Sequence, residues 1–97
     1  MNIEITTMKI LRVSETKYPS FPLRLQFAMA LRGYSSQQLA NRLFLTHSTI
    51  SGYRTGTRTP SCEILYDIAK ELQVSSDFLL CLSYYVFIEE ISTLPQK

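Results

Sequence analysis

Side chains able to carry out covalent chemistry are scarce in this sequence and share no regular spacing. The 97-residue chain has one histidine, His47, and no acidic residue between Glu15 and Glu63. General acid–base catalysis needs a positioned group of suitable pKa, and no nucleophile, base and orienting group occur together around His47. The two cysteines, Cys62 and Cys81, are too few for a disulfide framework and lack the spacing of a zinc site. We therefore expect neither an enzyme nor a bound metal or cofactor.

Charged residues are distributed unevenly, although the net charge is only +2. Residues 16–62 hold six basic residues and no acidic one, whereas residues 63–97 hold six acidic residues against two basic ones. Such asymmetry is typical of a protein that binds a polyanion, such as a nucleic acid, or an anionic surface with one part of its chain. Basic residues scattered over the surface would give the same counts. The six basic residues of the first group are Lys17, Arg24, Arg32, Arg42, Arg54 and Arg58.

Helices are predicted by capping residues and by apolar spacing. A first helix over 22–32 has a proline in its first turn and Gly33 after its end. The capping box S-x-x-Q from Ser35 starts a second helix. Thr46 is the expected N-cap of a third helix that runs to residue 53 or 54.

Two further helices are predicted in the acidic half. One starts at Ser61 and carries the clearest amphipathic stripe of the chain. The other starts at Ser75 or Ser76, and its inward-facing residues are expected to be Phe78, Leu79 and Leu82.

Both ends of the chain are rich in residues that favour β-strands. Residues 3–6 alternate between apolar and polar, residues 8–13 contain β-branched side chains, and residues 84–88 read Tyr-Tyr-Val-Phe-Ile. We expect these segments to pair with each other, or with a second subunit, in a small β element. A helix over 84–91 is the competing interpretation.

The third predicted helix has the properties of a helix that enters a groove of DNA. It follows the second helix after about three residues, and only Ile50 and Tyr53 are apolar in it. One edge can therefore dock on the body of the protein while the polar remainder stays free. The major groove is about 12 Å wide and admits one such helix.

Several short motifs occur in order, without gaps, over residues 23–83. They are S-T-I-S at 48–51, G-x-R-x-P-S at 56–61, I-A-x-x-L-x-V at 68–74 and D-x-L-L-x-L-S at 77–83. In these motifs the chain resembles the Cro/phage-repressor (XRE) helix-turn-helix family. The resemblance implies a mainly α, five-helix fold. It also implies a sequence-specific transcription regulator, foremost a repressor, that binds a double-stranded DNA operator as a homodimer.

The resemblance assigns roles to individual residues. Residues at the start of the third helix read base edges, and here they are His47, Ser48, Ser51 and Gly52. Residues at the start of the second helix and after the third contact phosphates, and these are Ser36, Gln37, Arg54, Thr55, Thr57, Arg58 and Thr59.

Three departures from the family pattern affect this region. Ser36 stands where the family often has Gln, and Gly52 where it commonly has a reading side chain. Met29 and Arg54 replace an Arg and a Glu that the family often pairs. Without that ion pair, we expect Arg54 to face DNA or solvent.

These observations divide the chain into an N-terminal extension (1–20), a DNA-binding domain (21–83) and a C-terminal extension (84–97). The apolar residues of 84–91 are expected either to be core under the N-terminal segment or, helped by that segment, to form the dimer contact. No targeting segment or membrane span is visible, which favours a cytoplasmic protein without a membrane partner, and no small-molecule effector is implied. The alternative functions are an antitoxin that also represses its own operon, and a protein-interaction module that has lost DNA binding.

Overall fold

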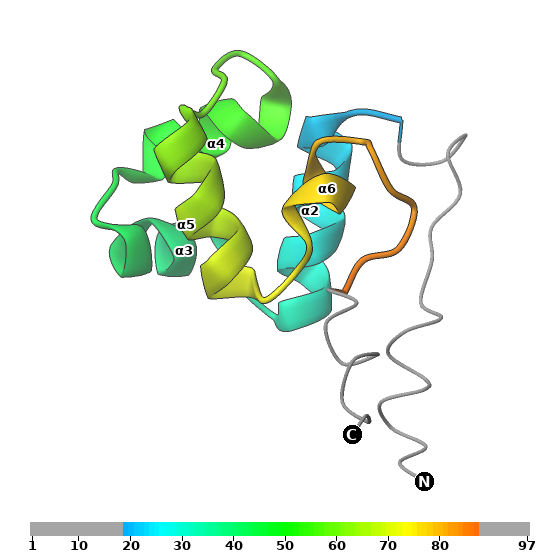
Figure 1. The fold of residues 1–97 in the computed structure, drawn as a ribbon. Coiled ribbons are helices and arrows are strands. Elements are labelled where there is room, and N and C mark those ends of the chain that lie inside the picture. Colours follow the sequence, from blue (N-terminus) through cyan, green and yellow to red (C-terminus); the bar gives the residue numbers. More distant parts are fainter. Residues whose placement is uncertain (1–18, 88–97) are drawn as a thin grey trace, which may run out of the picture.

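The computed structural model describes residues 19–87 and shows a mainly helical domain (Figure 1). This confirms the five-helix fold predicted from the sequence, and the predicted helix starts agree with the structure to within one residue. Helices α2 and α6 lie side by side, and α3 and α4 form a second contacting pair. The helices are α2 (Phe21–Arg32), α3 (Ser36–Leu43), α4 (His47–Thr55), α5 (Cys62–Leu72) and α6 (Ser76–Leu79).

Side-chain caps fix where the helices begin. The Ser35 hydroxyl accepts the Gln38 backbone N–H at 3.1 Å, and the Gln38 side chain accepts the Ser35 N–H at 2.8 Å. This reciprocal capping box satisfies two backbone donors that a helix start leaves unpaired. Thr46 caps α4 in the same way, since its hydroxyl accepts the Thr49 N–H at 3.2 Å. Gly33 ends α2 with a φ of +76°, which a glycine adopts without strain.

The hydrophobic core receives at least one fully buried apolar side chain from every helix. These side chains include Leu25, Leu39, Ile50, Ile68 and Phe78. Because Ile50 and Tyr53 are the two apolar side chains that α4 buries in the core, the helix is held along one edge.

The end of α6 differs from the sequence prediction. Leu82, expected to face inward, is 74% exposed. The physical reason is the shortness of the helix: α6 ends at Leu79, and Cys81 then adopts a φ of +66°, which turns the chain out of the helical path. Phe78 and Leu79 are buried as predicted.

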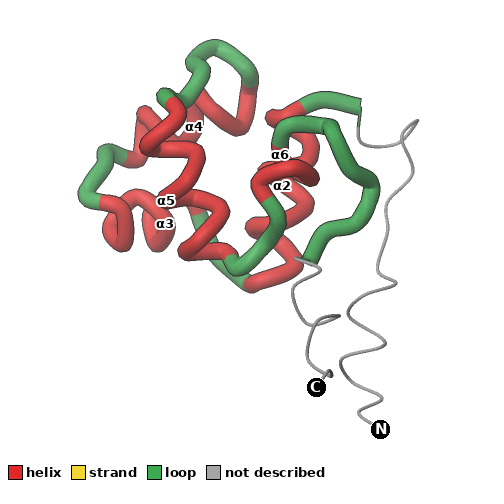
Figure 2. Tube along the Cα trace, in the orientation of Figure 1, coloured by secondary structure: helices red, strands yellow, loops and turns green. Residues whose placement is uncertain are grey.

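Residues 84–87 form neither a helix nor an extended strand: Tyr85 is a single β-bridge residue, and the rest of the segment is loop (Figure 2). Val86 is nonetheless fully buried, and its carbonyl accepts the Ser75 N–H at 2.7 Å. Phe87 packs against the same core, and the Arg32 guanidinium carbon lies 5.0 Å from its ring centroid. At these two residues the segment therefore covers the core of its own domain. Residues 88–91 and the predicted strands over 3–6 and 8–13 lie outside the described residues.

No helix within residues 19–87 has the length and apolar character of a membrane span.

Arg24 is a structural residue of the core, although the sequence grouped it with residues suited to a polyanion. Its side chain is only 1% exposed. One guanidinium nitrogen, Nη1, donates to the carbonyls of Phe78 at 2.8 Å and Ser83 at 2.7 Å. The guanidinium carbon also lies 4.9 Å from the Phe78 ring centroid and 5.6 Å from that of Tyr84. Arg24 thus joins α2 to α6 and to the segment that follows it.

We predict that Arg24→Ala lowers the free energy of unfolding by about 3 kcal/mol, because two carbonyls lose a charged donor and the core loses a long side chain. Arg24→Lys keeps the charge but cannot reproduce the planar guanidinium, so an intermediate loss is expected. Urea unfolding checks both values. Unchanged stability of Arg24→Ala would show that the two carbonyls do not depend on this side chain.

Phe44, the residue after α3, has an unusual conformation for an aromatic residue. Its φ is +59° and its side chain is 94% exposed. The left-handed conformation is unfavourable for a residue with a Cβ atom, by about 1–2 kcal/mol. With so little burial, packing cannot offset that cost.

We therefore predict that Phe44→Gly raises the free energy of unfolding by about 1 kcal/mol, because it removes backbone strain and almost no packing. Ala30→Gly is the matched control at an exposed position inside α2, where the same new residue is expected to cost about 1 kcal/mol. Opposite shifts of the urea midpoint would support the interpretation. A loss of stability in both variants would contradict it.

Candidate nucleic-acid interface

Helices α3 and α4 and the turn between them form the core of the candidate interface. The turn is short, and the Leu45 N–H bonds to the Ala40 carbonyl at 2.9 Å, which closes the end of α3. Ile50 and Tyr53 are buried, as predicted, so α4 docks by that edge. Its N-terminus is left at the surface, where His47 and Ser48 are both exposed.

The four predicted base-reading residues do not share one environment. His47 and Ser48 are exposed, and Ser51 is partly exposed. Gly52 is buried instead. An added Cβ atom at position 52 would lie 2.8 Å from both Cγ and Cδ of Arg58. The Arg58 side chain therefore covers the surface of α4 at this position.

The loop after α4 is folded back onto that helix. Gly56 ends α4 with a φ of +87°, and the Arg58 N–H then donates to the Gly52 carbonyl at 3.2 Å. The Thr55 hydroxyl donates to the Ser51 carbonyl at 3.0 Å. The predicted phosphate contacts at the last residue of α4 and in this loop are all exposed, namely Thr55, Thr57, Arg58 and Thr59.

Arg54 crosses from α4 to the first residue of α3. Its Nη1 donates to the Ser36 hydroxyl at 2.7 Å, its Nε is buried without a hydrogen-bond partner, and its carbonyl accepts Gln26 Nε2 at 2.7 Å. The expectation that Arg54 faces DNA or solvent is therefore wrong for much of this side chain. The sequence indicated the missing carboxylate, but it could not show that a hydroxyl on another helix takes its place.

The N-terminus of α3 combines a buried and an exposed residue. Ser36 is only 5% exposed and is occupied by Arg54. Gln37 is exposed, and its side-chain amide donates to the Asn41 side chain at 2.8 Å along the helix. The surface offered here therefore consists of Gln37, the free backbone N–H groups of the helix start and the edge of the Arg54 guanidinium.

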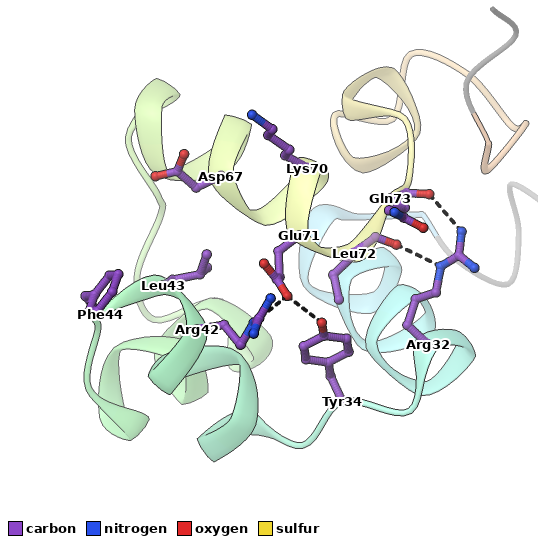
Figure 3. Close-up of a pocket in the computed structure, with 10 residues that line it drawn as sticks. All are labelled: Arg32, Tyr34, Arg42, Leu43, Phe44, Asp67, Lys70, Glu71, Leu72 and Gln73. Atoms are coloured by element: carbon purple, nitrogen blue, oxygen red, sulfur yellow. Dashed lines mark hydrogen bonds and ion pairs between the residues drawn. The ribbon is translucent and has the colours of Figure 1, made fainter.

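A cluster between α3 and α5 was not predicted. Glu71 accepts hydrogen bonds from the Tyr34 hydroxyl and from Arg42 Nε, the latter at 2.8 Å (Figure 3). The hydrogen bond from Tyr34, followed by that from Arg42, holds the pKa of the Glu71 carboxyl below its usual value. Arg42 and Glu71 are 29 positions apart, so no local sequence pattern could indicate the pair.

The arginines of residues 19–62 therefore have different roles in the structure. Arg24 is buried, Arg42 is paired with Glu71, and Arg32 donates to the Leu72 and Gln73 carbonyls at the end of α5 (Figure 3). Within residues 19–87, Arg54 and Arg58 form no ion pair. Both extend from α4 or from the loop that follows it.

The comparisons with known proteins agree with this geometry. A family model described as helix-turn-helix matches residues 25–79, which is more than half of the chain and includes all of α3, α4 and α5. No curated protein matches the chain. The matched family is a DNA-binding regulatory domain rather than a catalytic one. The chain therefore belongs to the helix-turn-helix proteins of the Cro/phage-repressor (XRE) type, and it is a transcription regulator that binds double-stranded DNA.

Proposed function

We propose that this regulator is a sequence-specific repressor that inserts the N-terminal half of α4 into the major groove of its operator. The observation that carries the proposal is that α4 is buried along one edge only. Its first two residues, His47 and Ser48, are exposed, and Ser51 is partly exposed. Imidazole and hydroxyl groups can donate to and accept from base edges.

Phosphate binding is assigned to the start of α3 and to the loop after α4. Helix starts attract anions through free N–H groups and the helix dipole. The Arg54 guanidinium lies at the start of α3 and forms no ion pair within residues 19–87. A cation at the positive end of a helix dipole is unfavourable until an anion joins it, so a DNA phosphate would relieve the repulsion. The proposed phosphate contacts are Gln37, Arg54, Thr55, Thr57 and Thr59, together with the backbone N–H of Ser36, whose hydroxyl is taken by Arg54.

A homodimer is proposed from the apolar surface that follows α6. Leu80 is 49%, Leu82 74% and Tyr85 42% exposed, and they occur within six residues of chain. Neighbouring exposed apolar side chains are typical of an interaction surface. A second copy would cover them and bring two α4 helices to the two halves of an operator.

Selection of duplexes from a random pool tests the reading function. We predict that the bound duplexes share two half-sites whose centres are about 34–36 Å apart, or a multiple of that distance, as expected for a two-fold dimer. A pool without any shared sequence would contradict sequence-specific reading, and a single half-site would contradict the dimer. Transcription from a promoter that overlaps the selected site then separates repression from activation.

Arg54→Ala tests the phosphate site. We predict weaker binding to selected and random DNA alike, with the slope of log K against log salt reduced by about one. Stability should fall by about 1–2 kcal/mol, because the buried Ser36 hydroxyl loses its partner. Arg42→Ala is the matched control, since Arg42 is already paired with Glu71, and it should leave the salt slope unchanged. An equal change of slope in both variants would contradict the assignment.

The double variant Leu82→Ser, Tyr85→Ser tests the dimer. We predict that the full chain sediments as a dimer and the variant as a folded monomer with weaker operator binding. Substitution is sharper than deletion of 84–97, because deletion would also remove the buried Val86. A full chain that sediments as a monomer would exclude the dimer. A variant that still sediments as a dimer would place the contact elsewhere.

A further inference from the structure

Gly52 and Arg58 form a fitted pair on the surface of α4. The Arg58 stem occupies the space of a side chain at position 52, since a Cβ atom there would lie 2.8 Å from Arg58 Cγ and Cδ and 3.1 Å from its Cβ. The backbone N–H of Arg58 also donates to the Gly52 carbonyl at 3.2 Å. Glycine weakens a helix interior, but here the missing side chain leaves the space in which the Arg58 stem lies.

The path of the stem carries the guanidinium toward the N-terminal half of α4. Arg58 Nη1 lies 3.3 Å from the Thr49 hydroxyl, and that hydroxyl lies 2.8 Å from the hydroxyl of the N-cap Thr46. Thr49 is almost one turn before Gly52, so the guanidinium has moved back along the helix toward His47 and Ser48. The Arg58 side chain as a whole stays exposed, and it forms no ion pair within residues 19–87.

Position 52 shares a helix face with position 48, because residues four apart are neighbours on the surface of a helix. Ser48 is one of the residues proposed to read bases. The side chain that glycine lacks at position 52 is therefore replaced, on the same face, by a guanidinium that comes from position 58.

We propose that Arg58 is a specificity-determining residue that reads a base in the major groove, and that Gly52 is the positioning residue that directs it there. The inference rests on the proposed DNA-reading function of α4. It differs from the phosphate contact that the family resemblance implies for Arg58. The forked donors of a guanidinium match the O6 and N7 acceptors of guanine, so the expected target is a G·C pair.

The test uses the full chain and the operator returned by selection. Affinity is measured for that operator, for each of its single base-pair variants and for random duplex DNA, over a range of salt concentrations. Arg58→Ala is expected to lose about 5- to 150-fold in discrimination at one G·C pair of each half-site, the range of a bidentate base contact. Its affinity for random DNA should change little.

Gly52→Ala is expected to lose discrimination at that same base pair, because the new Cβ displaces the Arg58 stem. Helix content by circular dichroism should be maintained or raised, since alanine favours a helix. Adding Arg58→Ala to Gly52→Ala should cause no further loss, because Gly52 acts only through Arg58. Arg42→Ala is the control, because Arg42 is paired with Glu71 outside the proposed DNA contacts, and it should leave base-pair preferences unchanged.

Two results would overturn the inference while leaving the reading function intact. The first is that Arg58→Ala binds every DNA sequence more weakly by the same factor, and that its slope of log K against log salt is lower by about one. That result would identify Arg58 as a phosphate contact. The second is a Gly52→Ala protein whose base preferences equal those of the parent. If the parent chain selects no sequence at all, the reading function itself fails, and the reading role of Arg58 fails with it.

Discussion

The narrow apolar edge of α4 is the constraint on which this structure depends. A helix proposed to enter a DNA groove can give few side chains to the core, and α4 buries Ile50 completely and Tyr53 almost completely. Two residues are little anchorage for a helix of nine. Polar contacts supply the rest, because Gln26 holds the last turn of α4 through the Arg54 carbonyl, and the Arg54 side chain holds the start of α3. The exposed N-terminus of α4 is thus positioned by Ile50 and Tyr53 in the core and by the polar contacts of Arg54.

The arginines show how a small basic domain separates folding from binding. A guanidinium has five donors and a flat surface, so it can tie several carbonyls together where no carboxylate is nearby. Arg24 does this inside the core, and Arg32 does it at the end of α5. Arg42 is neutralised by Glu71, which comes from the acidic half. Apart from Arg24, Arg32 and Arg42, the arginines within residues 19–87 are Arg54 and Arg58, at α4 and the loop after it. The number of basic residues in 16–62 therefore overstates the positive charge available to DNA.

Local signals made most of the fold predictable. A cap and its helix lie within a few residues of each other, so Ser35, Thr46 and Ser61 indicated where three helices start. Contacts between distant residues were not predictable, as with the 54 positions that separate Arg24 from the Phe78 carbonyl. In the candidate site, the exposure of His47 and Ser48 followed from helical periodicity. The burial of Gly52 did not, because it depends on the path that a later loop gives to Arg58.

The departures at positions 36 and 54 are joined by a hydrogen bond, and the departure at position 29 lies in the core. Met29 is 2% exposed and fills its place in the core without a charge, so no cation remains there for a carboxylate at position 54 to neutralise. The guanidinium of Arg54 needs a hydrogen-bond acceptor where it meets α3. The small side chain of Ser36 leaves room for the guanidinium, and its hydroxyl accepts the hydrogen bond. An internal pair of opposite charges has no net charge, whereas this arrangement leaves one positive charge beside the start of α3. The energy of that charge is lowest when a phosphate lies against it, because both the guanidinium and the helix dipole then face an anion. If Arg54 contacts a phosphate as proposed, an arrangement that lacks this ion pair within the fold adds an electrostatic term to the binding of DNA.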